Sequence, residues 1–189
     1  MDHLDPTLPV QPDYVTDQTL PFPVTPAGSE VTAGDIAPNA VNHFSCNGPT
    51  LTFEAGLVVE DAVIVTDCQV QFGAGVALED ATLVVLDPSD QAVRAPDGVR
   101  LGATDYCSTG QGGATVVSLG GVSLGSGTAA YGATVVADGS VSVDSVPDGL
   151  GGINFMSGGE IEAAASGTVG DCKFDPPRPF PVPVFKMVL

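Results

Sequence analysis

The sequence lacks tryptophan and is poor in basic side chains. Only 5 Lys and Arg residues stand against 23 acidic ones, which gives a formal net charge of -18. Proteins bind nucleic-acid phosphates and anionic lipid surfaces with clustered Lys and Arg. The composition therefore predicts no nucleic-acid partner and no anionic membrane surface as partner. The acidic surplus predicts a well-solvated surface, with cation binding as the alternative.

Long apolar segments are also missing. No apolar run approaches the roughly 18 residues that a transmembrane helix needs. The first six residues, Met1 to Pro6, lack the basic and apolar regions of a signal peptide. These absences predict no membrane span in this chain, and they leave two expectations open: a cytosolic protein, or a chain whose leader is not part of this sequence.

The cysteines do not form a zinc motif. No Cys-x-x-Cys occurs, and the only histidines are His3 and His43. An even number of cysteines without metal partners favours two disulfides and an oxidising compartment, with four buried free thiols as the alternative. Four cysteines can pair in three ways. The simplest way joins the two cysteines of neighbouring repeats and leaves the other two to pair with each other. The pairs would then be Cys46 with Cys68 and Cys107 with Cys172.

A repeat of nineteen to twenty residues runs through the chain. Residues 51–62 return at 70–81, with a Phe, an Ala-Gly pair and a Glu-Asp-Ala triplet in register. The same period relates 114–117 to 133–136, and 135–141 to 155–161. A fixed period near twenty in a chain rich in Val and Gly predicts a β-solenoid in which each repeat is one coil.

The predicted fold is all-β: a single-stranded β-solenoid (β-helix) with roughly 19–20-residue coils, parallel sheets and no significant helix. Phe53 and Phe72, one period apart, are expected to stack inside it. Residues 88–112 carry turn residues and are expected to form a loop excursion or an irregular coil. The expected coils are 50–68, 69–87, 113–131, 132–151 and 152–171.

Prolines set the expected boundaries. Residues 1–45 contain seven prolines and are predicted to form an extended N-terminal arm or linker. The solenoid is expected over 46–175. Residues 176–189 form a Pro-rich tail that ends in a strand-like apolar segment.

Two acidic pairs recur in the repeat. One period separates them, so their carboxylates are expected to stack along one edge, where they would repel each other unless solvated or bound to a cation. Calcium, which prefers oxygen ligands, is the one cofactor that this pattern suggests, and a solvated edge is the alternative. The weak candidates for a metal site are Glu60, Asp61, Glu79 and Asp80.

No catalytic or cofactor-binding residues are predicted. Glycoside cleavage needs paired acids across a groove, together with side chains such as Arg that hold the sugar. None of the arginines, Arg94, Arg100 and Arg178, falls within an acid cluster. A Ser-His-acid site would depend on His43 or His3, and no nucleophile motif accompanies either. The expectation is that the protein is not an enzyme.

Several stretches together resemble a known family. They are 46–53, 65–68, 72–73, 75–80, 101–107, 131–132, 137–139 and 156–161. In this order, and with the four cysteines, residues 42–189 resemble the C-terminal region of TadG-like proteins, the Flp (tight-adherence) pilus-assembly proteins of alphaproteobacteria. The resemblance implies a periplasmic or extracellular (cell-surface) location and no catalytic residues.

The expected function is a non-enzymatic, secreted or envelope-associated structural or interaction module. The expected partners are proteins of the cell envelope or of a pilus or filament, with pilus assembly or surface adhesion as the role and a homo-oligomer as an open possibility. Two alternatives remain: a bactofilin-like polymerising β-helix scaffold, and a carbohydrate-binding or carbohydrate-processing β-helix.

Overall fold

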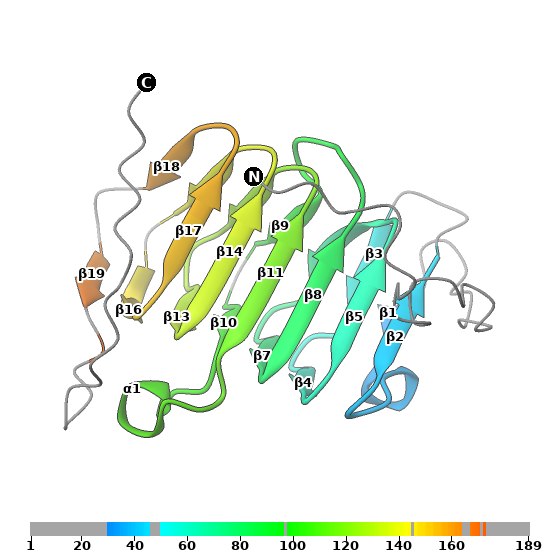
Figure 1. The fold of residues 1–189 in the computed structure, drawn as a ribbon, viewed down its shortest axis with the longest axis horizontal. Coiled ribbons are helices and arrows are strands. Elements are labelled where there is room, and N and C mark those ends of the chain that lie inside the picture. Colours follow the sequence, from blue (N-terminus) through cyan, green and yellow to red (C-terminus); the bar gives the residue numbers. More distant parts are fainter. Residues whose placement is uncertain are drawn as a thin grey trace, which may run out of the picture.

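The protein is a three-sided parallel β-solenoid (Figure 1). The computed structural model describes residues 30–45, 50–96, 98–144, 146–163, 167–170 and 172, with backbone only for 146–149 and 167–170. Each complete coil contributes one strand to each of three sheets, here named A, B and C, and all of the strand pairings are parallel. The first described coil has strands only in sheets A and B, and the last only in sheets A and C. The predicted fold class is confirmed.

The strands follow one another along the chain in the order A, C, B. Sheet A contains β1 (Glu30–Val31), β3 (Thr50–Phe53), β6 (Gln69–Phe72), β9 (Val93–Ala95), β12 (Val122–Leu124), β15 (Val141–Val143) and β18 (Ile161–Ala163). Sheet C contains β4 (Val58–Glu60), β7 (Ala77–Glu79), β10 (Arg100–Leu101), β13 (Ala129–Tyr131), β16 (Val146–Gly151) and β19 (Gly167–Gly170). Sheet B contains β2 (Val41–Phe44), β5 (Val63–Thr66), β8 (Ala81–Val85), β11 (Ala114–Ser118), β14 (Ala133–Ala137) and β17 (Asn154–Ser157).

The strand register reproduces the sequence repeat. Phe53 pairs with Phe72, Ala114 with Ala133, and Val135 with Phe155. Each repeat therefore occupies one coil, because equivalent residues of successive repeats lie side by side in the same sheet. All three echoes in the sequence are real structural repeats.

The core is the inside of the coil. Inward and outward side chains alternate along the strands, as the period of two in a β-strand requires. Most inward side chains are aliphatic or Phe, and a few are small polar residues such as Thr66 and Ser118. Phe53 and Phe72 are fully buried with ring centroids 5.2 Å apart, and their planes are tilted by 51°. The predicted internal contact between the two rings is confirmed, in a tilted geometry that suits aromatic quadrupoles.

The corner between sheets C and B has a left-handed backbone in most coils. Asn39, Asp61 and Asp80 have φ near +50°, and Gly132 and Gly152 have φ near +60° at the same corner. Asn, Asp and Gly are the residues that adopt this conformation at least cost. The corner therefore selects these residue types, which explains two of the acidic residues in the repeat.

The irregular segment 88–112 contains strands. β9 and β10 take their places in sheets A and C, and two excursions, 86–92 and 103–113, interrupt the coil. The second excursion holds the one-turn helix α1 (Tyr106–Thr109), which projects where sheets C and B meet (Figure 1). α1 and the short 3-10 helix η2 (Ala33–Asp35) are the only helices in the described part of the chain.

The solenoid begins earlier than the sequence predicts. Residues 30–45 were expected in the extended arm, but β1 pairs with β3 and β2 pairs with β5. Val31 and Phe44 are buried because they fill the core beneath the next coil. The boundary at residue 46 is therefore wrong: the two strands contain no proline, and Pro38 lies in the turn between them. Residues 1–29 and the tail 176–189 lie outside the described residues.

Candidate functional site

The acidic pairs of the repeat lie on one edge of the solenoid. Glu60 and Glu79 are register partners in β4 and β7, and Asp61 and Asp80 follow them at the corner. The backbone N–H of Asp61 donates to the carbonyl oxygen of Glu79 across 3.2 Å. The expected ladder of carboxylates is present.

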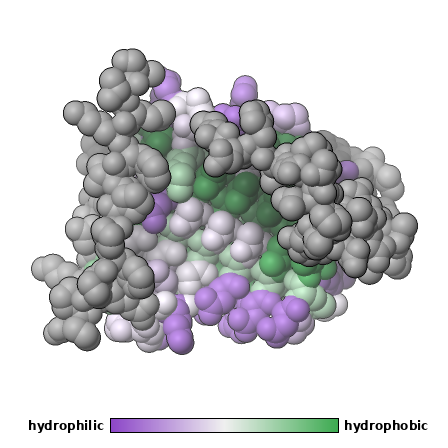
Figure 2. Space-filling model, viewed as in Figure 1, coloured by the Kyte–Doolittle hydropathy of each residue, from purple (hydrophilic) through white to green (hydrophobic). Residues whose placement is uncertain are grey.

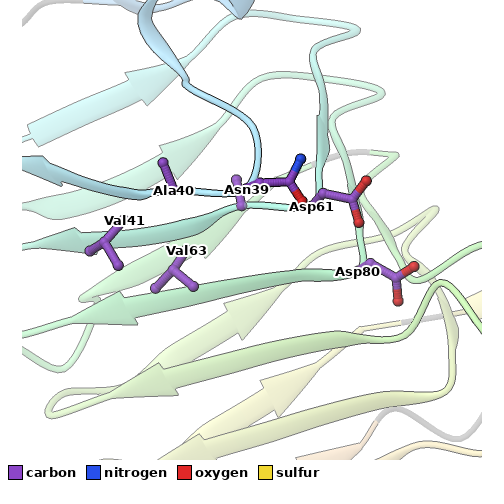
Figure 3. A pocket seen from close by; sticks show the side chains of 7 residues that line it. Asn39, Ala40, Val41, Asp61, Val63 and Asp80 are labelled. Atoms are coloured by element: carbon purple, nitrogen blue, oxygen red, sulfur yellow. The ribbon is translucent and has the colours of Figure 1, made fainter.

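A shallow hollow of about 370 Å³ lies at this corner. Val41 and Val63 lie on one side of it, and the carboxylates of Asp61 and Asp80 extend outward on the other (Figure 3). The two carboxylates come from adjacent coils and extend the same way. A glycosidase pair instead flanks the bond that it cleaves.

Within the part of the chain that the structure describes, protein groups contact two of the four carboxylates. The Arg100 guanidinium forms a salt bridge of 2.5 Å with Glu79 and donates to the carbonyl oxygen of Gly102. The backbone N–H of Gly112 donates to Asp80 across 2.9 Å. Repulsion along the edge is therefore reduced by one cation and one N–H dipole of the chain itself.

The carboxylate edge does not form a metal site with the residues that are described. Within them, no three His, Cys, Asp or Glu side chains come close enough together to hold a metal ion. The cation that the structure pairs with Glu79 is the guanidinium of Arg100. Sequence reasoning missed this ion pair, because the excursions before and after Arg100 hide its place in the repeat.

A second hollow, of about 170 Å³, lies on sheet A. Arg94 and Gln71 are register partners on β9 and β6, and Ser123 pairs with Arg94 from β12. Asp144 also lines this hollow. The side chains here offer hydrogen bonds, and they do not present a pair of acids across a groove.

A disulfide closes the C-terminal part of the solenoid. Cys107 in α1 is bonded to Cys172, 65 residues later in sequence, with Cα atoms 4.7 Å apart. This is one of the two expected pairs. Cys68 is buried and also disulfide-bonded. Cys46 lies outside the described residues, and so does the expected Cys46–Cys68 bridge.

The outer side of sheet B carries an uncharged grid of side chains, here called the sheet-B face. One column of register partners is Val41, Val63, Thr82, Thr115, Thr134 and Asn154. The next column is His43, Val65, Val84, Val117, Val136 and Met156. Nine of these twelve residues are Val or Thr, and none is acidic, although the chain carries 23 acidic residues.

The space-filling view agrees with this description. Green and pale atoms run across the visible part of the sheet-B face, and purple atoms gather along its lower rim (Figure 2). Sequence analysis missed the face, although the alternation in Ala-Thr-Val-Val was a signal for it. Each such strand buries one set of side chains and exposes the other.

Among the described residues, no helix is long and apolar enough to span a membrane. No curated protein and no solved structure is significantly similar to the chain. One protein-family model, described as a domain of unknown function (DUF7867), matches residues 2–173. Because this match covers most of the sequence, the chain belongs to the DUF7867 family.

Proposed function

We propose that this chain is a non-enzymatic structural or interaction module of the cell envelope or the cell exterior. Its role is to hold rigid, regularly spaced sheet faces in a fixed orientation for contact with a partner. The observation that carries the proposal is the architecture itself: a solenoid with a core filled by side chains, whose described hollows lie on its outer surface.

The cysteines support the proposed location. The bond between Cys107 and Cys172 and the disulfide-bonded state of Cys68 support an oxidising compartment, because cytosolic thiols are kept reduced. The resemblance to the C-terminal region of TadG-like proteins supports the same compartment. It also supports pilus assembly or surface adhesion as the specific role, with envelope or pilus proteins as partners.

The experiment is fractionation of native cells, followed by maleimide labelling of free thiols under denaturing, non-reducing conditions, so that buried thiols such as that of Cys68 are also accessible. We expect the protein in the envelope or culture-medium fraction with no labelled thiol. The double variant Cys107→Ser/Cys172→Ser is the matched control for the Cys68 bond, and it should also remain unlabelled. Protein in the cytosolic fraction with four labelled thiols would contradict the proposal and favour the bactofilin-like filament.

A further inference from the structure

We propose that the sheet-B face is a binding site for ice, which it contacts as a regular array of methyl and hydroxyl groups. The site consists of the Thr column (Thr82, Thr115, Thr134) and the Val column beside it (Val84, Val117, Val136). This inference goes beyond the proposed function and does not depend on it.

The face has the periodicity of a lattice. Neighbouring parallel strands lie about 4.8 Å apart, and alternate residues of one strand lie about 6.6 Å apart. The pairings from β2 through β17 run without a shift in register, so both spacings repeat across the sheet. The strands lie side by side with little change of direction (Figure 1). Rows of oxygen atoms on the faces of an ice crystal repeat at spacings of the same order.

The chemistry of the side chains suits an ordered water layer. Thr and Val are β-branched and stiff at χ1, so their methyl groups hold fixed positions. Each Thr adds a hydroxyl group that both donates and accepts a hydrogen bond, as water does. No carboxylate, ammonium or guanidinium group lies within the two columns to pull water molecules out of a lattice arrangement.

Charge and area disfavour a second copy of the chain as the occupant. Two copies would each carry a net charge of -18 and repel each other. From strand spacings alone the face measures about 300–400 Å², whereas a stable protein interface buries about 800 Å² on each partner. An ice surface is already rigid and loses no side-chain freedom on contact. A small, pre-organised array of protein side chains is therefore enough to bind it.

The test measures how the purified 189-residue chain partitions between a slowly growing ice front and the remaining liquid. We expect enrichment in the ice and inhibition of ice recrystallisation. In Thr115→Tyr, a bulky ring at the centre of the face lifts the other side chains out of contact, so both effects should fall by about tenfold or more. The matched control is Thr52→Tyr, at an outward Thr on sheet A that is half-buried like Thr115, and it should behave as the native protein.

Circular dichroism and thermal unfolding of both variants establish that they fold. Exclusion of the native protein from ice overturns the proposal. Equal loss of activity in folded Thr115→Tyr and Thr52→Tyr also overturns it. So does a sedimentation profile in which the native chain is dimeric and Thr115→Tyr is monomeric, because the face would then join two copies. None of these results affects the thiol-labelling experiment.

Discussion

At the scale of single residues, two of the repeated acids are explained by backbone conformation. Asp61 and Asp80 occupy a corner with positive φ, where the side chain is chosen for its tolerance of the left-handed region. Repetition of an acid at a fixed period therefore does not require a ligand. Here the repeated Asp lies at a corner of the coil with positive φ, and Gly occupies the same corner in later coils.

Substitution of Asp61 tests whether its backbone conformation, and not its carboxylate, explains the presence of Asp at this corner. We expect Asp61→Ala to lower the free energy of unfolding by about 1 kcal/mol, because the left-handed conformation costs Ala about 1–2 kcal/mol. Asp61→Gly should be neutral or slightly stabilising. Urea unfolding measures both. Asp138→Ala, at an exposed position without positive φ, is the control and should change little. Equal destabilisation by Ala and Gly would mean that the carboxylate itself matters.

A second residue-scale prediction concerns Asp35, which closes a capping box with Thr32. The backbone N–H and the hydroxyl group of Thr32 donate to Oδ2 of Asp35 across 2.9 and 2.7 Å. These hydrogen bonds favour the ionised form and lower the pKa of Asp35 below its usual value of 3.8. The resulting stability is present above pH 3.8 and is lost as the pH falls through the lowered pKa.

Carbon-detected NMR titration measures this shift. In Thr32→Val the hydroxyl donor is lost and the backbone donor remains, so the pKa of Asp35 should rise part of the way towards its usual value. Thr134→Val, on a distant strand of sheet B, is the control and should leave the titration of Asp35 unchanged. A titration that does not respond to Thr32→Val would show that the hydroxyl group contributes nothing.

At the scale of elements, the contact between β3 and β6 depends on two fully buried rings. Phe72→Ala should lower the free energy of unfolding by about 3–5 kcal/mol, because the closed coil above and below cannot collapse into the cavity. Urea unfolding followed by circular dichroism measures the loss. Gln71→Ala, the exposed neighbour on the same strand, should change stability by less than about 0.5 kcal/mol. A small effect of Phe72→Ala would mean that the rings are not packed as described.

The elements also show what the sequence could predict. The repeat at 51–81 is visible because three consecutive strands recur without insertion, and so the solenoid and its register follow from it. The coil that contains β9, β10 and β11 is hidden because excursions before β9 and after β10 break the period. β1 and β2 escape detection because β1 has only two residues and both strands lie among prolines. The acidic edge was predictable, whereas the Arg100 salt bridge was not, since it depends on the hidden coil.

At the scale of the whole molecule, the Cys107–Cys172 bond ties the last coils to the middle of the solenoid. Closing a 65-residue loop contributes about 4 kcal/mol in the chain-entropy model. Coils contact only their neighbours, so this stabilisation should stay local. In Cys107→Ser/Cys172→Ser, we expect faster amide hydrogen exchange in β14 and β17 and unchanged exchange in β5 and β8. Mass spectrometry measures the exchange.

The control for that variant is Ser108→Ala, which changes α1 beside the bond and keeps the bond intact. Its exchange pattern should match that of the native protein. Uniform acceleration through every sheet of the double variant would contradict a local effect. It would show that the coils unfold as one unit.

The excursions at 86–92 and 103–113 enter and leave at corners, and the strands on either side keep their partners. Evolution can therefore change such a protein in two independent ways. Duplication or loss of one whole winding alters the length of the rod by a fixed step, and a new segment at a corner adds a local feature without disturbing the windings beyond it. Related chains should differ in length by multiples of about one winding, or by insertions that map to corners.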